Sequence, residues 1–141
     1  MSQTLLIVGT RKGVFILKSN PHRASWECSG PFCPGWDVLV TEYDETTSFV
    51  YAGGTSAWYG AAVWRSPDFG RSWEHSSRGM TFDDASIGVD KVWSLTAGDG
   101  RVYAGVAPAG LFVSEDHGTT WQEIPSLRRH PSALRWRPSN G

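Results

Sequence analysis

Two groups of polar residues have the types and spacing that could support chemistry. Asp83 and Asp84 are adjacent in a long segment, 78–90. Such a pair could act as general acid and base or hold a cation, although adjacent acids in a loop are more often simply solvated. Arg128 and His130 belong to a short basic cluster that could bind a carboxylate or a phosphate. Zinc spacing, a phosphate-cradling glycine loop and a G-x-S-x-G motif are missing, so we expect no metal and no cofactor.

The most regular feature of the chain is a motif that occurs twice. The pattern S-x-D-x-G-x-x-W is present at 66–73 and again at 114–121. An Asp can accept hydrogen bonds from backbone N–H groups, a Gly supplies the positive φ that closes a hairpin, and a Ser hydroxyl ties down the loop entry. The pattern therefore predicts a self-contained turn between two strands, with structural carboxylates. The motif residues are Ser66, Asp68, Gly70, Trp73, Ser114, Asp116, Gly118 and Trp121.

The motif marks an internal repeat of about 47 residues. Trp73 and Trp121 are 48 positions apart, and 47 positions before Trp73 the chain has Trp26. A repeat of this length is typical of the four-stranded blades of β-propellers. The first unit is degenerate, because its hairpin, 19–26, has Pro and Arg where the motif has Asp and Gly. The motif therefore does not specify the geometry of this turn.

The repeats predict an all-β fold, a β-propeller segment of about three four-stranded antiparallel blades with these hairpins. We expect the first blade at 4–36 without its innermost strand, the second at 37–90, the third at 91–125, and a C-terminal loop or edge strand at 126–141. The expected strands are Leu5–Thr10, Val14–Lys18, Ser25–Cys28, Asp37–Tyr43, Phe49–Gly53, Ala62–Ser66, Ser72–Ser76, Lys91–Ala97, Arg101–Val106, Leu111–Ser114, Thr120–Ile124 and, at the end, Ala133–Arg137.

The repeated motif resembles the Asp-box, or BNR repeat, of sialidase-like and glycosyl-hydrolase-like β-propellers. Segments 92–95, 103–105 and 127–131 are similar to the N-terminal portion of longer bacterial members. The resemblance implies that further blades follow, and that a sialidase would need three arginines, a Tyr–Glu pair and an Asp acid/base. Arg11 lies near the place of the family's arginine strand but does not match it. We therefore expect a non-catalytic repeat module, with a fragment of a sialidase-like glycoside hydrolase as the alternative.

The second unit differs from the third by four extra residues between its second and third strands. The expected loop, 55–60, contains Trp58 and Tyr59, which are hard to attribute to blade packing alone. In the β-propellers that the motif resembles, the loop at this place lies on the side that usually binds ligands, opposite the Asp-box hairpins. We predict that Trp58 and Tyr59 contact a small molecule, a glycan or a protein, with surface or inter-blade packing as the alternative. The further candidates on that side are Arg11, Asp83, Asp84, Arg128 and His130.

Composition limits the other partners. The net charge is −1 and no basic stripe is present, so we expect no nucleic acid. The only apolar run near the N-terminus, 5–8, is too short for a signal peptide or a membrane span, so we expect a cytoplasmic chain with no membrane partner. Cys28 and Cys33 could meet across a loop, but two cysteines do not form a disulfide scaffold.

Three blades leave open edges, which favour pairing with more protein. Either further chain completes the ring or a second copy does, giving a six-bladed propeller. In the second case, residues 133–137 of each copy would supply the strand that the other copy's first blade lacks. Self-association through open blade edges is therefore a third hypothesis.

Overall fold

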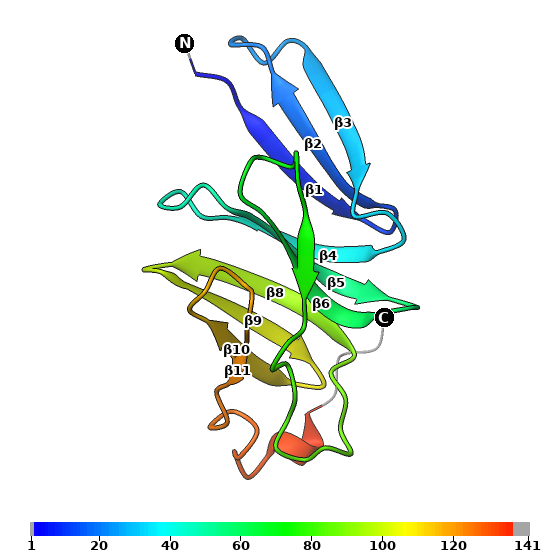
Figure 1. Ribbon diagram of the computed structural model, residues 1–141, viewed down its shortest axis with the longest axis vertical. Coiled ribbons are helices and arrows are strands. Elements are labelled where there is room, and N and C mark those ends of the chain that lie inside the picture. Colours follow the sequence, from blue (N-terminus) through cyan, green and yellow to red (C-terminus); the bar gives the residue numbers. More distant parts are fainter. Residues whose placement is uncertain (1, 137–141) are drawn as a thin grey trace.

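Antiparallel hairpins account for nearly all regular structure in the computed structural model, which describes residues 2–136 (Figure 1). Three sheets have the strand orders β1-β2-β3, β4-β5-β6-β7 and β8-β9-β10-β11. The strands are β1 Leu5–Thr10, β2 Gly13–Ser19, β3 Trp26–Phe32, β4 Asp37–Tyr43, β5 Val50–Ser56, β6 Gly60–Ser66, β7 Glu74–Ser76, β8 Lys91–Gly98, β9 Arg101–Ala107, β10 Gly110–Ser114 and β11 Gln122–Glu123.

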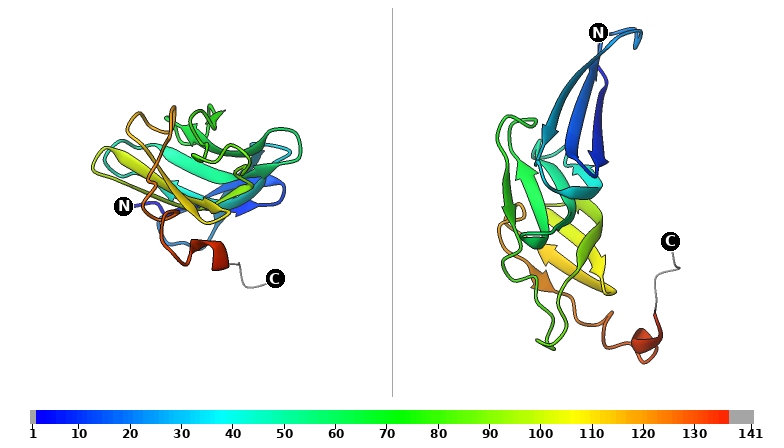
Figure 2. Two further views of the ribbon diagram at one scale, coloured as in Figure 1. Left: turned by 90° about the horizontal axis from the view of Figure 1, so that it is seen from below. Right: turned by 90° about the vertical axis from the view of Figure 1, so that its right-hand side faces the viewer.

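The three sheets follow one another in chain order along the long axis of the molecule (Figure 2). Within each sheet, strands that follow one another in the sequence are paired, as in a blade built from successive hairpins. The predicted fold class is confirmed: the chain is an all-β, β-propeller-like segment of about three blades. The first sheet has three strands and the other two have four. The exact blade limits stay a prediction.

Two apolar cores lie between the sheets. The first core joins Val14 and Ile16 of the first sheet to Val38, Ala52 and Ala62 of the second. Strand alternation places every second residue on one side, so the intervening residues of β5 and β6 face the third sheet. The second core therefore contains the next positions along these strands and their partners in the third sheet. Its fully buried side chains include Tyr51, Val63, Val92, Ala104 and Phe112.

The long segment 77–90 packs on the third sheet through its apolar residues. Met80 and Phe82 are buried in the second core, and Phe82 contacts Phe112 at a ring-centroid distance of 5.5 Å. A Cβ on Gly110 would lie 2.5 Å from the Phe82 ring, so the glycine lets the loop approach the strand closely. Packing on the third sheet therefore explains part of the length of this segment.

The edge of β1 is open, because the first sheet has no strand on that side. A groove of about 440 Å³ runs beside this edge. It is lined by Gln3, Leu5, Leu6, Ile7, Thr41, Glu42, Tyr43 and Phe69.

The predicted edge strand Ala133–Arg137 is wrong for the described residues. Residues Ala133–Arg135 form a 3₁₀ helix, η1, in which Arg135 N–H donates to the carbonyl of Ser132 at 2.9 Å. Arg137 lies outside the described residues.

The 3₁₀ helix and the first sheet lie at opposite ends of the long axis (Figure 1). This C-terminal segment therefore does not complete the first sheet of its own chain. No helix within residues 2–136 is long and apolar enough to cross a membrane.

Candidate functional site

The first Asp-box turn holds its own polar groups. The Ser66 hydroxyl donates to Asp68 Oδ1 at 2.9 Å and accepts from the Gly70 N–H at 2.8 Å. Asp68 also accepts from the backbone N–H of Ser72 at 2.8 Å and from its hydroxyl at 2.7 Å. The hydrogen bonds from Ser72, followed by the one from Ser66, lower the pKa of Asp68. Both oxygens of the carboxylate are thus engaged within one hairpin.

The second Asp-box turn repeats this arrangement. The Ser114 hydroxyl donates to Asp116 Oδ1 at 2.8 Å, and the Gly118 N–H donates to the Ser114 hydroxyl at 2.8 Å. Thr120 supplies its N–H at 2.8 Å and its hydroxyl at 2.6 Å to the two carboxylate oxygens. Desolvation alone would raise the pKa of Asp116, but the hydrogen bonds from Thr120 and Ser114 outweigh it and lower the pKa to about 2. The repeated geometry favours the structural role of these acids over a catalytic one.

The degenerate first turn uses an asparagine in place of the aspartate. Asn20 Oδ1 accepts from the backbone N–H of Ala24 at 2.8 Å and from that of Ser25 at 3.4 Å. Arg23 stands at the motif's glycine position with a φ of 57°. An Asn side chain forms the same local turn as Asp, so a shift of one position preserves the hairpin. Asn20 could have predicted this turn from the sequence, but the motif has its acidic residue one position later.

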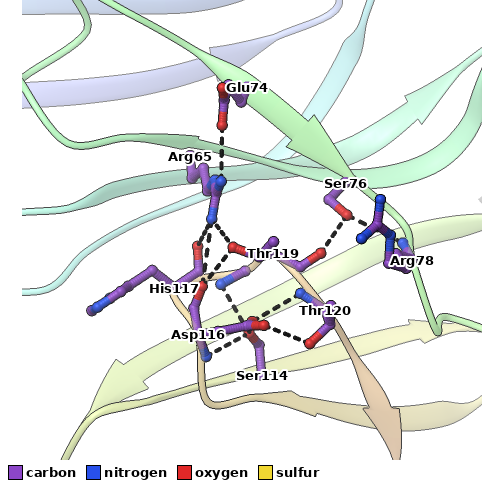
Figure 3. A network of polar contacts seen from close by, with 10 residues as sticks. Arg65, Glu74, Ser76, Arg78, Ser114, Asp116, His117, Thr119 and Thr120 are labelled. Atoms are coloured by element: carbon purple, nitrogen blue, oxygen red, sulfur yellow. Dashed lines mark hydrogen bonds and ion pairs between the residues drawn. The ribbon is translucent and has the colours of Figure 1, made fainter.

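The second Asp-box turn is also held from the neighbouring sheet (Figure 3). Arg65, on β6, donates from Nη1 to the carbonyl oxygens of Asp116 at 3.4 Å and His117 at 3.3 Å, and to the Thr119 hydroxyl. Its Nη2 forms an ion pair with Glu74 at 2.8 Å. Sequence reasoning missed Arg65, because the residue precedes the motif and its partners follow 51 to 54 positions later.

The predicted ligand contacts Trp58 and Tyr59 lie at the tip of the β5–β6 hairpin. Their side chains are 89% and 67% exposed. The expected loop 55–60 is shorter than predicted, because β5 runs to Ser56 and β6 starts at Gly60. The extra residues therefore mostly lengthen the two strands, and only the residues between them form the turn.

Tyr59 belongs to an aromatic cluster that also contains Trp36, Trp64 and His75. The rings of Tyr59 and Trp36 stack with centroids 6.3 Å apart and an interplanar angle of 7°. His75 lies 5.1 Å from each of these two rings and 4.6 Å from Trp64. Trp36 is buried, whereas Tyr59 and His75 are exposed. The cluster thus presents two accessible rings, Tyr59 and His75, on the buried ring of Trp36. The sequence had predicted only Tyr59 and not the other three residues.

A second cluster brings three of the predicted polar residues together. Asp83 forms an ion pair with Arg129 at 3.2 Å. Arg128 donates to the carbonyl of Ala109 at 3.2 Å and lies over the Phe82 ring, 4.7 Å from its centroid. Hydrogen bonds from the side chain and backbone of Ser86 lower the pKa of Asp84, with a smaller effect from the charge of Arg128. These acids are therefore occupied by neighbouring donors.

Two candidates remain, His130 and Arg11. His130 Nδ1 lies 2.8 Å from the Ser132 hydroxyl, and its ring stacks with Trp136. Arg11 is exposed in the turn between β1 and β2. The functional roles of all seven candidates stay predictions. Within residues 2–136, no group of three or more His, Cys, Asp or Glu residues could hold a metal ion.

The two cysteines are free thiols in different environments. Cys28 is exposed on β3, whereas Cys33 is buried. Desolvation raises the pKa of Cys33 to about 12. The two thiols are therefore not joined in a disulfide.

Comparison with known families agrees with the fold and the turn geometry. Residues 63–76, which run from β6 through the first Asp-box turn to β7, match the BNR-Asp box repeat family. The chain therefore contains a BNR-Asp box repeat, as its turn motif predicted. No curated protein matches the chain.

Proposed function

We propose that the chain is a non-catalytic Asp-box repeat module that binds a glycan on an aromatic surface formed by Trp58, Tyr59 and His75. The observation that carries this proposal is the ring of Tyr59, which is exposed yet fixed in a parallel stack on the buried Trp36. A ring held in place before binding loses little conformational entropy when a ligand docks. The surface is therefore suited to contact a flat partner.

The exposure of Trp58 supports a binding role over a packing role. An indole that is 89% exposed contributes little apolar burial to the fold. Large amphipathic rings on loops are common in binding surfaces, because they supply contact area at low entropic cost. Trp58 directly precedes Tyr59 at the same hairpin tip, and we therefore include both residues in the proposed surface.

The chemistry of the surface favours a sugar ring. Sugar rings have an apolar face and a rim of hydroxyl groups, and the exposed rings offer flat apolar faces beside the Tyr hydroxyl, the Trp N–H and the His nitrogens. Ligand sites commonly combine aromatic walls with a few such polar groups. A peptide segment or a small apolar molecule is the alternative ligand that fits these rings, and it would be favoured if none of the sugars bound.

The state of the carboxylates supports a non-catalytic module. Asp68 and Asp116 are held by their own turns, and Asp83 is paired with Arg129. A general acid at neutral pH needs a raised pKa, whereas hydrogen bonds lower the pKa of Asp84. The sialidase-like glycoside hydrolase stays the alternative, and turnover of a fluorogenic sialoside that is lost in Asp84→Asn would favour it.

The test is a calorimetric titration of the chain with each of four sugars: chitopentaose, cellopentaose, maltopentaose and 3′-sialyllactose. We expect at least one of them to bind, and Trp58→Ala and Tyr59→Ala to weaken that binding about tenfold or more, by roughly 1.4 kcal/mol. Trp93→Ala is the matched control, because Trp93 is an exposed ring outside the cluster. Failure of all four sugars to bind, or equal binding by the Trp58 and Trp93 variants, would contradict the proposal.

A further inference from the structure

The first sheet has an apolar outer side on which no sheet packs within residues 2–136. Directly paired residues of antiparallel strands project to the same side of a sheet. Leu6 pairs with Leu17, and Val8 pairs with Phe15. The alternate residue Ile16 is buried against the second sheet. The other four side chains therefore lie on the opposite side of the sheet from Ile16. The first sheet lies at one end of the long axis of the molecule (Figure 1).

The equivalent side of the second sheet is buried. When Gly9 is aligned with Gly53, Leu6 and Val8 correspond to Val50 and Ala52. Leu6 and Val8 are 45% and 40% exposed, whereas Val50 and Ala52 are fully buried. The same difference separates Trp26, which is exposed, from Trp121, which is buried in the second core. We name the outer side of the first sheet the leading face.

The third sheet has an open side of the opposite kind. Tyr103 pairs with Val113, and Gly105 pairs with Leu111, so these residues share the side that faces away from the second sheet. In the second sheet, the residue equivalent to Tyr103 is Tyr51, which is fully buried in the second core. Tyr103, Leu111 and Val113 are only partly buried. We name this side of the third sheet the trailing face.

The two open faces are the two halves of an interface that the chain already contains. Between the second and third sheets, Tyr51 and Val63 lie on the side of the second sheet that is equivalent to the trailing face. They pack in one core with Ala104 and Phe112, which lie on the side of the third sheet that is equivalent to the leading face. The first core has the same arrangement, with Ile16 on one side and Ala52 on the other. One copy of the chain therefore carries both complementary surfaces, and no sheet formed by residues 2–136 covers either of them.

We propose that two copies of the chain associate head to tail, with the trailing face of each packed on the leading face of the other. Two sets of three sheets give a ring of six, within the usual four to eight blades of β-propellers. Because the ring closes after two copies, both open faces of each copy are covered and no filament grows. The contact reproduces the sheet-on-sheet packing seen twice within the chain.

The new interface differs from the internal one in its polar contacts. Arg65 links the second sheet to the third, but the residue at the equivalent position of the third sheet is Val113. The copy-to-copy contact consequently rests on apolar burial. Apolar association is not screened by salt, in contrast to exposed ion pairs. The dimer should therefore keep its affinity when the ionic strength rises.

The first test is the solution mass of the chain by light scattering coupled to size exclusion, from 5 to 100 µM, in 50 and 500 mM NaCl. We expect a mass twice that of the single chain at the higher concentrations, unchanged by salt. A monomer at 100 µM, or a distribution of larger species, would overturn the proposal.

The second test separates head-to-tail association from other contacts. Leu6→Lys blocks the leading face and Leu111→Lys blocks the trailing face, and each variant alone should be monomeric. An equimolar mixture keeps one intact interface, so it should form a dimer that is weaker than the wild-type dimer. Trp58→Lys, at an exposed site outside both faces, should dimerise normally.

Circular dichroism and thermal unfolding of each variant establish that it is folded. Leu6 is half-exposed, so Leu6→Lys should fold even if Leu111→Lys does not. A folded Leu6→Lys protein that dimerises with wild-type affinity would therefore overturn the proposal by itself.

Discussion

The guanidinium of Arg65 donates a hydrogen bond of 3.3 Å to the backbone carbonyl of His117, which lies in the Asp-box turn of the next sheet (Figure 3). The same group bonds the carbonyl of Asp116. A turn that is closed by its own Ser and Asp is thus also attached to its neighbour. This contact, with the second apolar core, fixes the third sheet to the second.

Arg65→Lys should lower the free energy of unfolding by about 2 kcal/mol, because a lysine cannot contact Glu74 and the turn carbonyls at the same time. Urea unfolding followed by tryptophan fluorescence measures the change. Arg71→Lys is the control, because Arg71 is an exposed arginine within the first Asp-box turn. Equal stability of the two variants would show that the contact contributes nothing.

The stability of the protein should fall below about pH 4, in part through Asp116. Its pKa is about 2 in the folded chain, below the ordinary value of 3.8. A depressed pKa contributes stability that is present above the ordinary value and is lost as the pH falls through the folded value. Urea unfolding of the wild type and Asp116→Asn between pH 6 and pH 2 measures this. The variant should be less stable at pH 6, and the difference should shrink toward pH 2; a constant difference would refute the assignment.

Gly70→Ala should destabilise the first Asp-box turn by about 2 kcal/mol. Gly70 has a φ of +89°, and an added Cβ would lie 2.7 Å from Ile16 Cδ1 in the first sheet. Gly88→Ala is the matched control, because an added Cβ there meets no atom within 4 Å. Thermal unfolding of both variants should show a lower Tm for Gly70→Ala alone. A similar loss in the Gly88 variant would mean that the turn geometry is not responsible.

Cys28 should react rapidly with a thiol reagent in the folded protein, whereas Cys33 should react only when the chain unfolds. Cys28 is exposed, and burial raises the pKa of Cys33 to about 12, which suppresses the reactive thiolate. The measurement is mass spectrometry after timed labelling at pH 7.5, with and without urea. Labelling of both thiols at one rate in the native protein would contradict the burial of Cys33.

Local patterns predicted much of the fold. The strands Leu5–Thr10 and Asp37–Tyr43 have the predicted limits, because alternation and flanking turn residues define them. The outer strand expected at Ser72–Ser76 begins only at Glu74, because the backbone of Ser72 is engaged by Asp68 in the turn. The Asp-box turns could be predicted because every partner lies within a few positions.

Contacts between sheets could not be predicted in this way. Trp36 and Tyr59 stack although they come from different connections, and nothing in their own repeats specifies the partner. The segment 133–137 reads as a short strand by composition, but the turns after Pro131 favour local i→i+3 hydrogen bonds. Such choices depend on what lies nearby in space, which a single sequence pattern does not contain.

In the proposed division of roles, the Asp-box residues support the fold and the aromatic surface binds the ligand. The most direct measurement is calorimetric titration of Tyr59→Ala and Asp116→Ala with the sugar that the wild type binds, at a temperature where both variants are folded. We expect Tyr59→Ala to bind the sugar about tenfold more weakly or worse with an unchanged Tm, and Asp116→Ala to have a lower Tm with unchanged affinity. Binding that survives in Tyr59→Ala and disappears in folded Asp116→Ala would contradict this division of roles.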